Sequence, residues 1–359
     1  MEKELSIWII PTFLFLSACL LSFIGTYLFR KIAYRFQIMD IPNIRSSHSE
    51  PTPRGGGVAI FFSFHILLIL AVLLSPKSHF NFKFIWGLIL GGAVVSLVGF
   101  WEDVKGVPAL LRLIAQIGTG AILIAVGLTF KKIEIPFWGE IELGLFEIPF
   151  TLFWVVWIIN IYNFMDGIDG LATGVGMIVA IFFSLIASRM GNGLMFLLCI
   201  ILAGCGAGFL IHNFPPAKIF LGDVGSSFIG YLFAGVTLLG DKSSTGSYSI
   251  WIPILLLGAF IFDTGVTLIR RMMRGERWFA AHRSHFYQRL IRLHLTHKQV
   301  SIIEYGLAVL LGYSSLFYLE ASHISRGLVL LGWILLFIMG AITIHLYERR
   351  YSQGIEERV

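Results

Sequence analysis

Residues 145–171 read LFEIPFTLFWVVWIINIYNFMDGIDGL, an apolar run that leads directly into a loop with two aspartates. The apolar part is long enough to cross about 30 Å of hydrocarbon as a helix. Asp166 and Asp169 follow it, and each precedes a glycine. Charged side chains at the end of a membrane span are costly and are retained mainly for function. This stretch therefore predicts a membrane-spanning helix that delivers carboxylates to one membrane face.

Similar apolar runs recur along the whole chain of 359 residues, of which 57% are hydrophobic and only 13% are charged. Soluble domains average about 25% charged residues. We predict an all-α, polytopic integral membrane protein with about eleven transmembrane helices. No linker or repeat separates a second domain, so residues 1–359 are expected to form a single membrane domain. The predicted helices cover residues 7–29, 56–74, 84–100, 109–128, 145–162, 171–187, 194–211, 226–239, 250–269, 300–319 and 327–346.

The distribution of lysine and arginine predicts the orientation. These residues are concentrated in the loops after the odd-numbered runs and in the C-terminal tail. Because they favour the cytoplasmic side, we place the N-terminus outside and the C-terminus in the cytoplasm. The basic net charge follows from this asymmetry, and we predict no nucleic-acid partner. On the outer side, residues 131–146 (KKIEIPFWGEIELGLF) alternate as in a β-hairpin, and we assign them no chemistry.

The polar segments lie in the loops 40–57, 101–108, 160–171, 212–226 and 270–298, which all fall on the predicted cytoplasmic face. Acidic residues converging there would repel one another, and their oxygen atoms suit Mg²⁺, with Mn²⁺ as an alternative. For any single acid, helix capping is an alternative role. The acids concerned are Glu102, Asp103, Asp166, Asp169 and Asp223.

The last of these loops is basic and reads AHRSHFYQR at residues 281–289, with His282, Arg283 and His285. The arginine fork is suited to binding phosphate. Attraction to anionic lipid headgroups is the alternative for the arginines that abut a span, at positions 270, 271 and 274.

Two features of small residues are less specific. The glycines at 55–57 follow Arg54 and would allow close backbone approach to a ligand, or equally small-residue packing between helices. Cys19, Cys199 and Cys205 fall inside apolar runs without metal-ligand spacing, so we expect them to be packing residues.

The strings NIYNFMDGIDGL (160–171) and NFPPAKIFLGDVGS (213–226), with the acidic pair after the third run, resemble the polyprenyl-phosphate N-acetylhexosamine-1-phosphate transferases. The resemblance extends over the motif region, about 40–298. The strings at 42–57 and 281–290 are most similar to the branch that uses UDP-GlcNAc or its 6-deoxy relatives FucNAc and QuiNAc in O-antigen synthesis. Many members have Asp-Asp where this chain has Glu102-Asp103, and in the last motif only His285 matches a family histidine directly.

The resemblance implies a role for each matching position. Asp223 and Asn163 match metal-binding positions, and Asp169 and Phe220 match contacts to uracil. Asn213 is implied to line the nucleotide pocket, and Asp166 belongs to the same site. Glu102 or Asp103 is implied to orient or deprotonate the lipid phosphate. His285 and Arg283 lie where the family handles the diphosphate or sugar, and we add Arg54 and His282 as candidate substrate-binding residues.

The function expected from this resemblance is transfer of a HexNAc 1-phosphate from a UDP-sugar to undecaprenyl phosphate in the bacterial inner membrane. Direct attack by the lipid phosphate is preferred over a phospho-enzyme formed on Asp103 or Asp166. The resemblance also allows a homodimer. The competing class is an ion-coupled transporter, because carboxylates and glycine-broken helices also mark carriers. The clustering of polar motifs on one face, away from the midplane, favours the enzyme.

Overall fold

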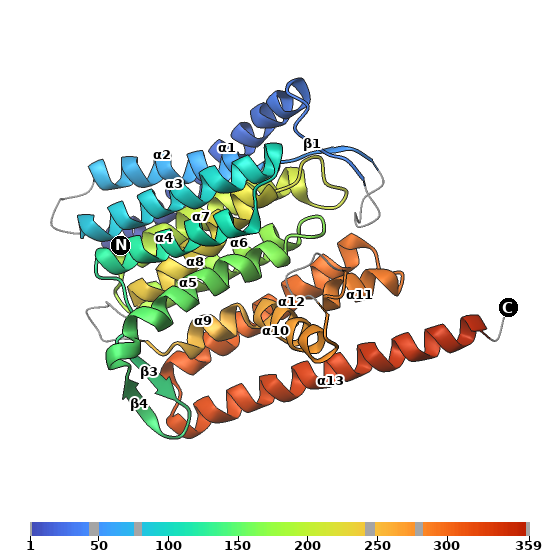
Figure 1. Cartoon of the computed structure of the whole chain (residues 1–359). Coiled ribbons are helices and arrows are strands. Elements are labelled where there is room, and N and C mark those ends of the chain that lie inside the picture. The colour runs from blue at the N-terminus through green and yellow to red at the C-terminus, as the bar shows by residue number, and fades with distance from the viewer. Residues whose placement is uncertain (1, 43–49, 75–80, 241–247, 277–282, 357–359) are drawn as a thin grey trace.

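The computed structural model describes residues 2–42, 50–74, 81–240, 248–276 and 283–356 (Figure 1). The fold is a helical bundle, which confirms the predicted all-α membrane architecture. In the described part of the chain, nine helices are long and apolar enough to cross a membrane. These are α1 (Glu2–Arg35), α2 (Gly57–Leu74), α3 (Phe82–Lys105), α5 (Glu147–Phe164), α6 (Leu171–Arg189), α7 (Gly193–Asn213), α8 (Gly222–Gly240), α12 (His297–Glu320) and α13 (His323–Glu356).

Two of the predicted spans differ from these nine. The fourth run forms α4 (Ala109–Ala125), which is shorter than the others. The ninth run is divided into α9 (Trp251–Leu256) and α10 (Gly258–Met273) at Leu257, whose backbone leaves the helical region. Gly258 follows the interruption, and glycine is a weak helix former because its backbone loses the most freedom on ordering. A short helix, α11 (Phe286–Arg292), precedes α12.

Helix α8 forms the centre of the bundle. All of its residues except Asp223 are buried. It packs against α2, α3 and α5, while α7 packs against α1 and α6. Helix α13 lies at the edge and contacts mainly α11 and α12 (Figure 1). The residue of this central helix that is not buried is therefore Asp223, in its first turn.

The connections α3–α4, α5–α6 and α7–α8 lie at one end of the bundle, on the right in Figure 1, together with the described parts of the α1–α2 connection, residues 36–42 and 50–56. The α1–α2 connection contains a short antiparallel pair, β1 (Met39–Asp40) with β2 (Thr52–Pro53). At the opposite end, β3 (Lys132–Ile135) pairs with β4 (Gly139–Glu142), which confirms the predicted hairpin, and a 3₁₀ turn (Gly144–Phe146) leads into α5. The motif-bearing loops thus share one end of the molecule.

The glycine run brings the start of α2 against the start of α8. The backbone N–H groups of Gly56 and Gly57 donate to the carbonyl oxygens of Phe220 and Leu221 at 2.9 and 2.8 Å. A Cβ atom added to Gly57 would lie 2.2 Å from the Cα atom of Gly225. Of the two roles considered for this run, close backbone packing is the one that these contacts support.

We expect Gly57→Ala to lower the free energy of unfolding by about 1–3 kcal/mol, because the added methyl group meets backbone that has no room to move. Gly118→Ala is the control, since a Cβ at that position of α4 meets nothing within 4 Å. Thermal unfolding of both purified variants in detergent is the measurement. A Gly57→Ala midpoint equal to that of Gly118→Ala would contradict the close packing.

Candidate active site

Arg54 joins two acidic motifs that are far apart in the sequence. Its Nε atom lies 2.6 Å from Oδ1 of Asp103 at the end of α3, and its Nη2 atom lies 3.2 Å from Oδ1 of Asp223 at the start of α8. The backbone N–H of Arg54 donates to the carbonyl oxygen of Ile38 at 3.1 Å, which fixes the segment that carries the guanidinium. The glycine-rich loop, the acidic pair and the α8 motif therefore meet at Arg54.

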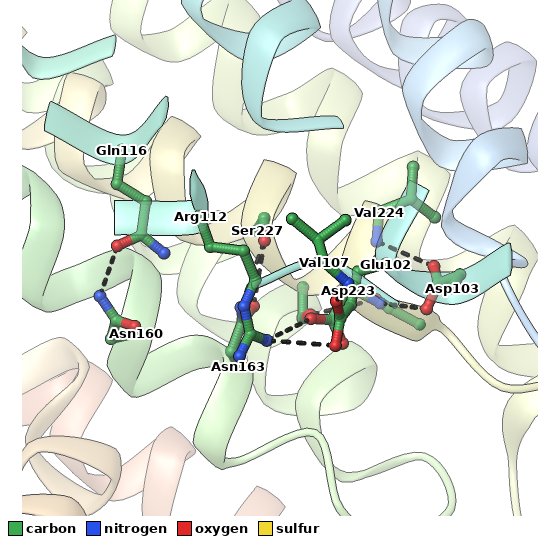
Figure 2. A network of polar contacts seen from close by, with 12 residues as sticks. Glu102, Asp103, Val107, Arg112, Gln116, Asn160, Asn163, Asp223, Val224 and Ser227 are labelled. Carbon is green, nitrogen blue, oxygen red and sulfur yellow. Dashed lines mark hydrogen bonds and ion pairs between the residues drawn. The ribbon is translucent and has the colours of Figure 1, made fainter. Parts of the chain in front are cut away.

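Arg112 makes a second bridge, which joins Asp223 to Glu102 (Figure 2). Its Nη1 atom lies 3.3 Å from Oδ2 of Asp223 and 3.4 Å from Oε1 of Glu102. Glu102 also accepts a hydrogen bond from the backbone N–H of Val107. Each oxygen of the Asp223 carboxylate thus faces a different arginine.

Asp103 is the most deeply buried of these acids, with 9% of its surface exposed. It accepts hydrogen bonds from the backbone N–H groups of Asp223 and Val224, at 2.9 and 3.1 Å (Figure 2). These N–H groups belong to the first turn of α8 and have no partner within that helix. Gly222, at φ +75°, leaves room for the carboxylate, because a Cβ there would lie 2.5 Å from Oδ2 of Asp103. Asp103 therefore caps α8 from another helix, while its side chain also pairs with Arg54.

The charges of the site affect two groups in its loops. Burial alone would lower the pKa of the Arg54 guanidinium, but the nearby carboxylates of Asp103, Asp223 and Asp40 outweigh it and raise that pKa. Arg54 is therefore a permanent cation. Burial raises the pKa of Asp166 well above its usual range, and the negative charges of Asp223 and Asp103 raise it further. This raised pKa favours the protonated form of Asp166.

Asn163 lies beside the same face of α8. Its side chain is 3.3 Å from Oγ of Ser227, which stands one helical turn after Asp223 (Figure 2). The carboxylate, amide and hydroxyl oxygens of Asp223, Asn163 and Ser227 are donors that fit Mg²⁺. Among the residues described, no three His, Cys, Asp or Glu side chains gather as metal ligands. Mg²⁺ is commonly held by one or two carboxylates plus substrate phosphates, and this donor set matches that mode.

The residues implied to bind the nucleotide form a neighbouring group. Oδ2 of Asp169 accepts from the backbone N–H of Ala217 at 2.9 Å, and Oδ1 lies 3.3 Å from Nδ1 of His297. Oδ1 of the buried Asn213 accepts from the N–H of Gly170 at 3.2 Å. Phe220 is half-buried in the α7–α8 loop. The structure thus joins the α5–α6 and α7–α8 loops, and the nucleotide contacts of these residues stay predictions.

The basic loop is only partly described. His285 is buried, and its Nδ1 atom lies 2.9 Å from Oδ1 of Asp263 on α10. Tyr287 donates from its hydroxyl to the carbonyl oxygen of Phe164 at 3.0 Å, which joins this loop to the end of α5. Arg283 is exposed, and His282 lies outside the described residues.

Three residues of the site were missed from the sequence. Nothing in the local sequence of Arg112 distinguishes it from an arginine that binds lipid headgroups. Asp263 lies within an apolar run, where the cost of an acid in a membrane is a signal of function. His297, which contacts Asp169, lies in the basic loop without a pattern that marks it.

Comparisons with known proteins identify the family of this chain. The profile of glycosyl transferase family 4 matches residues 85–241. A probable undecaprenyl-phosphate N-acetylglucosaminyl 1-phosphate transferase of Bacillus subtilis (strain 168) is 32% identical over 326 residues, which covers 90% of this chain and 88% of the relative. The chain belongs to glycosyl transferase family 4. A decaprenyl-phosphate N-acetylglucosaminephosphotransferase of Mycobacterium leprae is 31% identical, covering 93% of this chain and 90% of the relative.

A more distant member of the family is also similar. The phospho-N-acetylmuramoyl-pentapeptide-transferase of Aquifex aeolicus is 28% identical over 259 residues, covering 64% of this chain and 68% of the relative. Membership of a family of membrane transferases confirms the resemblance stated from the motifs. It favours an enzyme over the ion-coupled transporter that was the alternative.

Proposed function

We propose that this family 4 enzyme transfers a HexNAc 1-phosphate from a UDP-sugar to a polyprenyl phosphate, such as undecaprenyl phosphate, and releases UMP. The observation that carries the proposal is the cluster at the start of α8, in which Arg54 and Arg112 hold three carboxylates. Guanidinium groups bind phosphate oxygens in pairs, and partly exposed carboxylates suit a divalent cation. The names of the relatives support the same reaction.

In the proposed reaction, an oxygen of the lipid phosphate attacks the β-phosphorus of the UDP-sugar. The bond from that phosphorus to the oxygen bridging to the α-phosphate breaks, and UMP leaves with the electron pair. Phosphoryl transfer needs mainly positioning and charge neutralisation. The second pKa of a phosphate is about 6, so the nucleophile is largely ionised at neutral pH and needs no strong base. Arg54 and Arg112 are positioned to exchange carboxylate partners for phosphate oxygens.

The metal would be held by Asp223, with Asn163 and Ser227 beside it. When bound, Mg²⁺ supplies positive charge that stabilises the diphosphate oxygens as the leaving group departs. The two arginines hold the Asp223 carboxylate in one orientation before substrate arrives. Glu102 lies next to Arg112 and, in this proposal, orients the lipid phosphate through that arginine.

The contacts of Asp103 favour direct transfer over a phospho-enzyme. Its two oxygens already accept from two backbone N–H groups and from the Arg54 guanidinium. A carboxylate with its lone pairs occupied in this way is a poor nucleophile, and its attack would also uncap α8. An isolable phosphorylated aspartate would contradict the one-step reaction.

We propose that the site faces the cytoplasm, with the N-terminus outside and the C-terminus inside. The lysine and arginine distribution supports this orientation, and UDP-sugars are cytosolic. Because the lipid phosphate lies at the membrane interface, a site at one end of the bundle can meet both substrates. The relatives' names favour GlcNAc as the sugar, and FucNAc or QuiNAc transfer in O-antigen synthesis stays a prediction, as does a homodimer.

The direct test is UMP release by the purified protein with Mg²⁺, UDP-GlcNAc and undecaprenyl phosphate. We expect turnover that EDTA abolishes and that excess Mg²⁺ or Mn²⁺ restores, because the donor set holds only oxygen ligands. Full activity in EDTA would contradict the metal assignment. A panel of UDP-HexNAc donors with one lipid acceptor identifies the sugar, and a folded protein that releases UMP from none of them would contradict the proposed function.

A further inference from the structure

Asp263 is a buried carboxylate on α10. Among the described residues, its hydrogen-bond donors lie in the basic loop, at the start of α11 and on α10 itself. It is 4% exposed. Its oxygens accept from Nδ1 of His285 at 2.9 Å and from the backbone N–H groups of Phe286 and Tyr287 at 2.9 and 3.2 Å. The hydroxyl of Thr267 donates to it at 3.2 Å. A membrane-edge carboxylate with four donors is strongly fixed, and it fixes the groups that donate to it in turn.

The two backbone N–H groups are the first of α11, so they have no partner within that short helix. Asp263 satisfies them from a neighbouring helix, as an N-cap residue does from within its own chain segment. The other end of α11 is held separately, because Arg289 makes two hydrogen bonds to Glu348 of α13 at 2.9 and 2.6 Å. Helix α11 is thus anchored to α10 at its start and to α13 at its end.

The same carboxylate determines which ring nitrogen of His285 carries the proton when the imidazole is neutral. Because a carboxylate that already receives two backbone N–H groups acts as an acceptor, the contact requires the proton of a neutral His285 to be on Nδ1. The ring is held between aromatic neighbours, with centroids 6.0 Å from Phe164 and 5.8 Å from Tyr287, at interplanar angles of 29° and 12°. Both the tautomer and the plane of the ring are therefore fixed.

This assembly also contacts the loop that contains Asp166. A Cβ atom on Gly167 would lie 2.0 Å from the hydroxyl of Tyr287, so this loop and the start of α11 are in direct contact. The hydroxyl itself donates a hydrogen bond to the carbonyl oxygen of Phe164, at the end of α5. The position of Asp263 is therefore transmitted to the acidic loop through His285 and Tyr287.

We propose that Asp263 is a positioning residue of the transfer reaction: it holds the start of α11 and thereby sets the tautomer and orientation of His285. The kinetic part of this inference rests on the proposed function, whereas the structural part does not. Asp263 acts through His285 and does not itself contact substrate. Its role explains how a loop that matches the family's histidine pattern at only one position can still present that histidine in a single orientation.

The kinetic test is Asp263→Asn, which keeps the size of the side chain and removes its charge. We expect kcat to fall about 10–100-fold, as for other carboxylates that orient a histidine, with KM for the UDP-sugar changed less than about 3-fold. In a His285→Ala background, the same substitution should cost less than about 3-fold, because its effect passes through the imidazole. Full activity of Asp263→Asn, or equal losses in both backgrounds, would overturn the proposal.

The matched control is Thr264→Val, one position along α10. Thr264 is also buried, but its hydroxyl bonds only to carbonyl oxygens of its own helix, at 2.7 and 3.3 Å. We expect its kcat to equal that of the wild type. A loss in Thr264→Val as large as in Asp263→Asn would assign the effect to general disturbance of α10 and would also overturn the proposal.

A second measurement needs no activity and no stable variant at Asp263. In ¹⁵N-histidine-labelled wild type, the His285 resonance is identified by its absence from His285→Asn. We expect the Nδ1–H tautomer, and an Nε2–H tautomer would refute the role of Asp263 even if Asp263→Asn fails to fold. If the wild type releases no UMP, the proposed function fails while this spectrum still decides the structural part.

Discussion

Asp223→Ala is expected to lower the rate of UMP release by at least about 10³-fold, the scale on which charge-stabilising groups act in transfer reactions. Asp223 is the residue of α8 that is not buried, and its side chain is 22% exposed between two arginines. Its removal takes away the proposed metal ligand and leaves Arg54 and Arg112 facing each other across an empty position. The measurement is the initial rate with saturating substrates, together with thermal unfolding in detergent.

Two variants control for this loss. Glu140→Ala removes a carboxylate from the hairpin at the opposite end of the bundle, where its side chain is 55% exposed, and should leave the rate within about 2-fold of wild type. Cys199→Ala changes a fully buried packing residue of α7 and should also retain nearly normal turnover. Asp223→Ala with normal turnover would contradict both the metal assignment and the proposed mechanism.

Arg54→Ala is expected to reduce both stability and activity. The Asp103 side chain has no solvent exposure, so loss of the guanidinium leaves a buried carboxyl group without its cationic partner. Breaking a buried pair costs about 3–5 kcal/mol, and because Arg54 itself is partly exposed we expect about 2–4 kcal/mol here. Turnover should fall at least about 100-fold, since the guanidinium group that would bind phosphate oxygens in pairs is absent. Chemical unfolding and UMP release measure the two effects separately.

The double variant Arg54→Ala/Asp103→Asn separates the two causes. Asparagine keeps an oxygen that can accept from the N–H of Asp223, and it needs no cationic partner. We therefore expect it to recover part of the stability lost in Arg54→Ala without recovering turnover. Arg54→Lys, which keeps the charge but not the fork, should retain the stability and lose most of the turnover. An Arg54→Ala variant as stable as the wild type would show that the buried pair contributes little.

The acidic half of the site could be predicted because acidic residues at the ends of membrane spans are costly and usually mark a functional site. Asp166, Asp169 and Asp223 stand out against apolar surroundings, and the alternation of spans places them at one end. The hairpin was also predictable, because its alternating pattern interrupts the apolar runs. Both predictions depend on a local difference in polarity between a few residues and the apolar sequence around them.

The arginine bridges could not be predicted in this way. Arg112 and Asp223 are 111 positions apart, and Arg54 and Asp223 are 169 positions apart. Which arginine meets which acid depends on how the helices pack, and the positive-inside pattern already accounts for both arginines. The break between α9 and α10 was missed for a similar reason, since a hydropathy pattern does not register a single residue with non-helical backbone.

Asp263 was missed for the opposite reason. It carries a clear signal, a carboxylate inside an apolar run, but a span prediction from length and hydropathy takes no account of a single acid. The histidine pattern of the basic loop looked incomplete because His285 alone matched the family. The structure shows that its partner comes from α10, which precedes the loop in sequence.

The packing of the Pro53–Gly57 segment onto Phe220 and Leu221 has a consequence for biosynthesis. The chain is made from its N-terminus, so Arg54 and Asp103 enter the membrane long before residue 223 exists. Until α8 is inserted, the N-terminal helices α2 and α3 lack the backbone that the glycine run packs against and that Asp103 caps. The ion pair between Arg54 and Asp223 and the cap formed by Asp103 can therefore form only after α8 has been made. In a nascent chain halted before Gly222, the Asp103 side chain and the glycine run lack these partners.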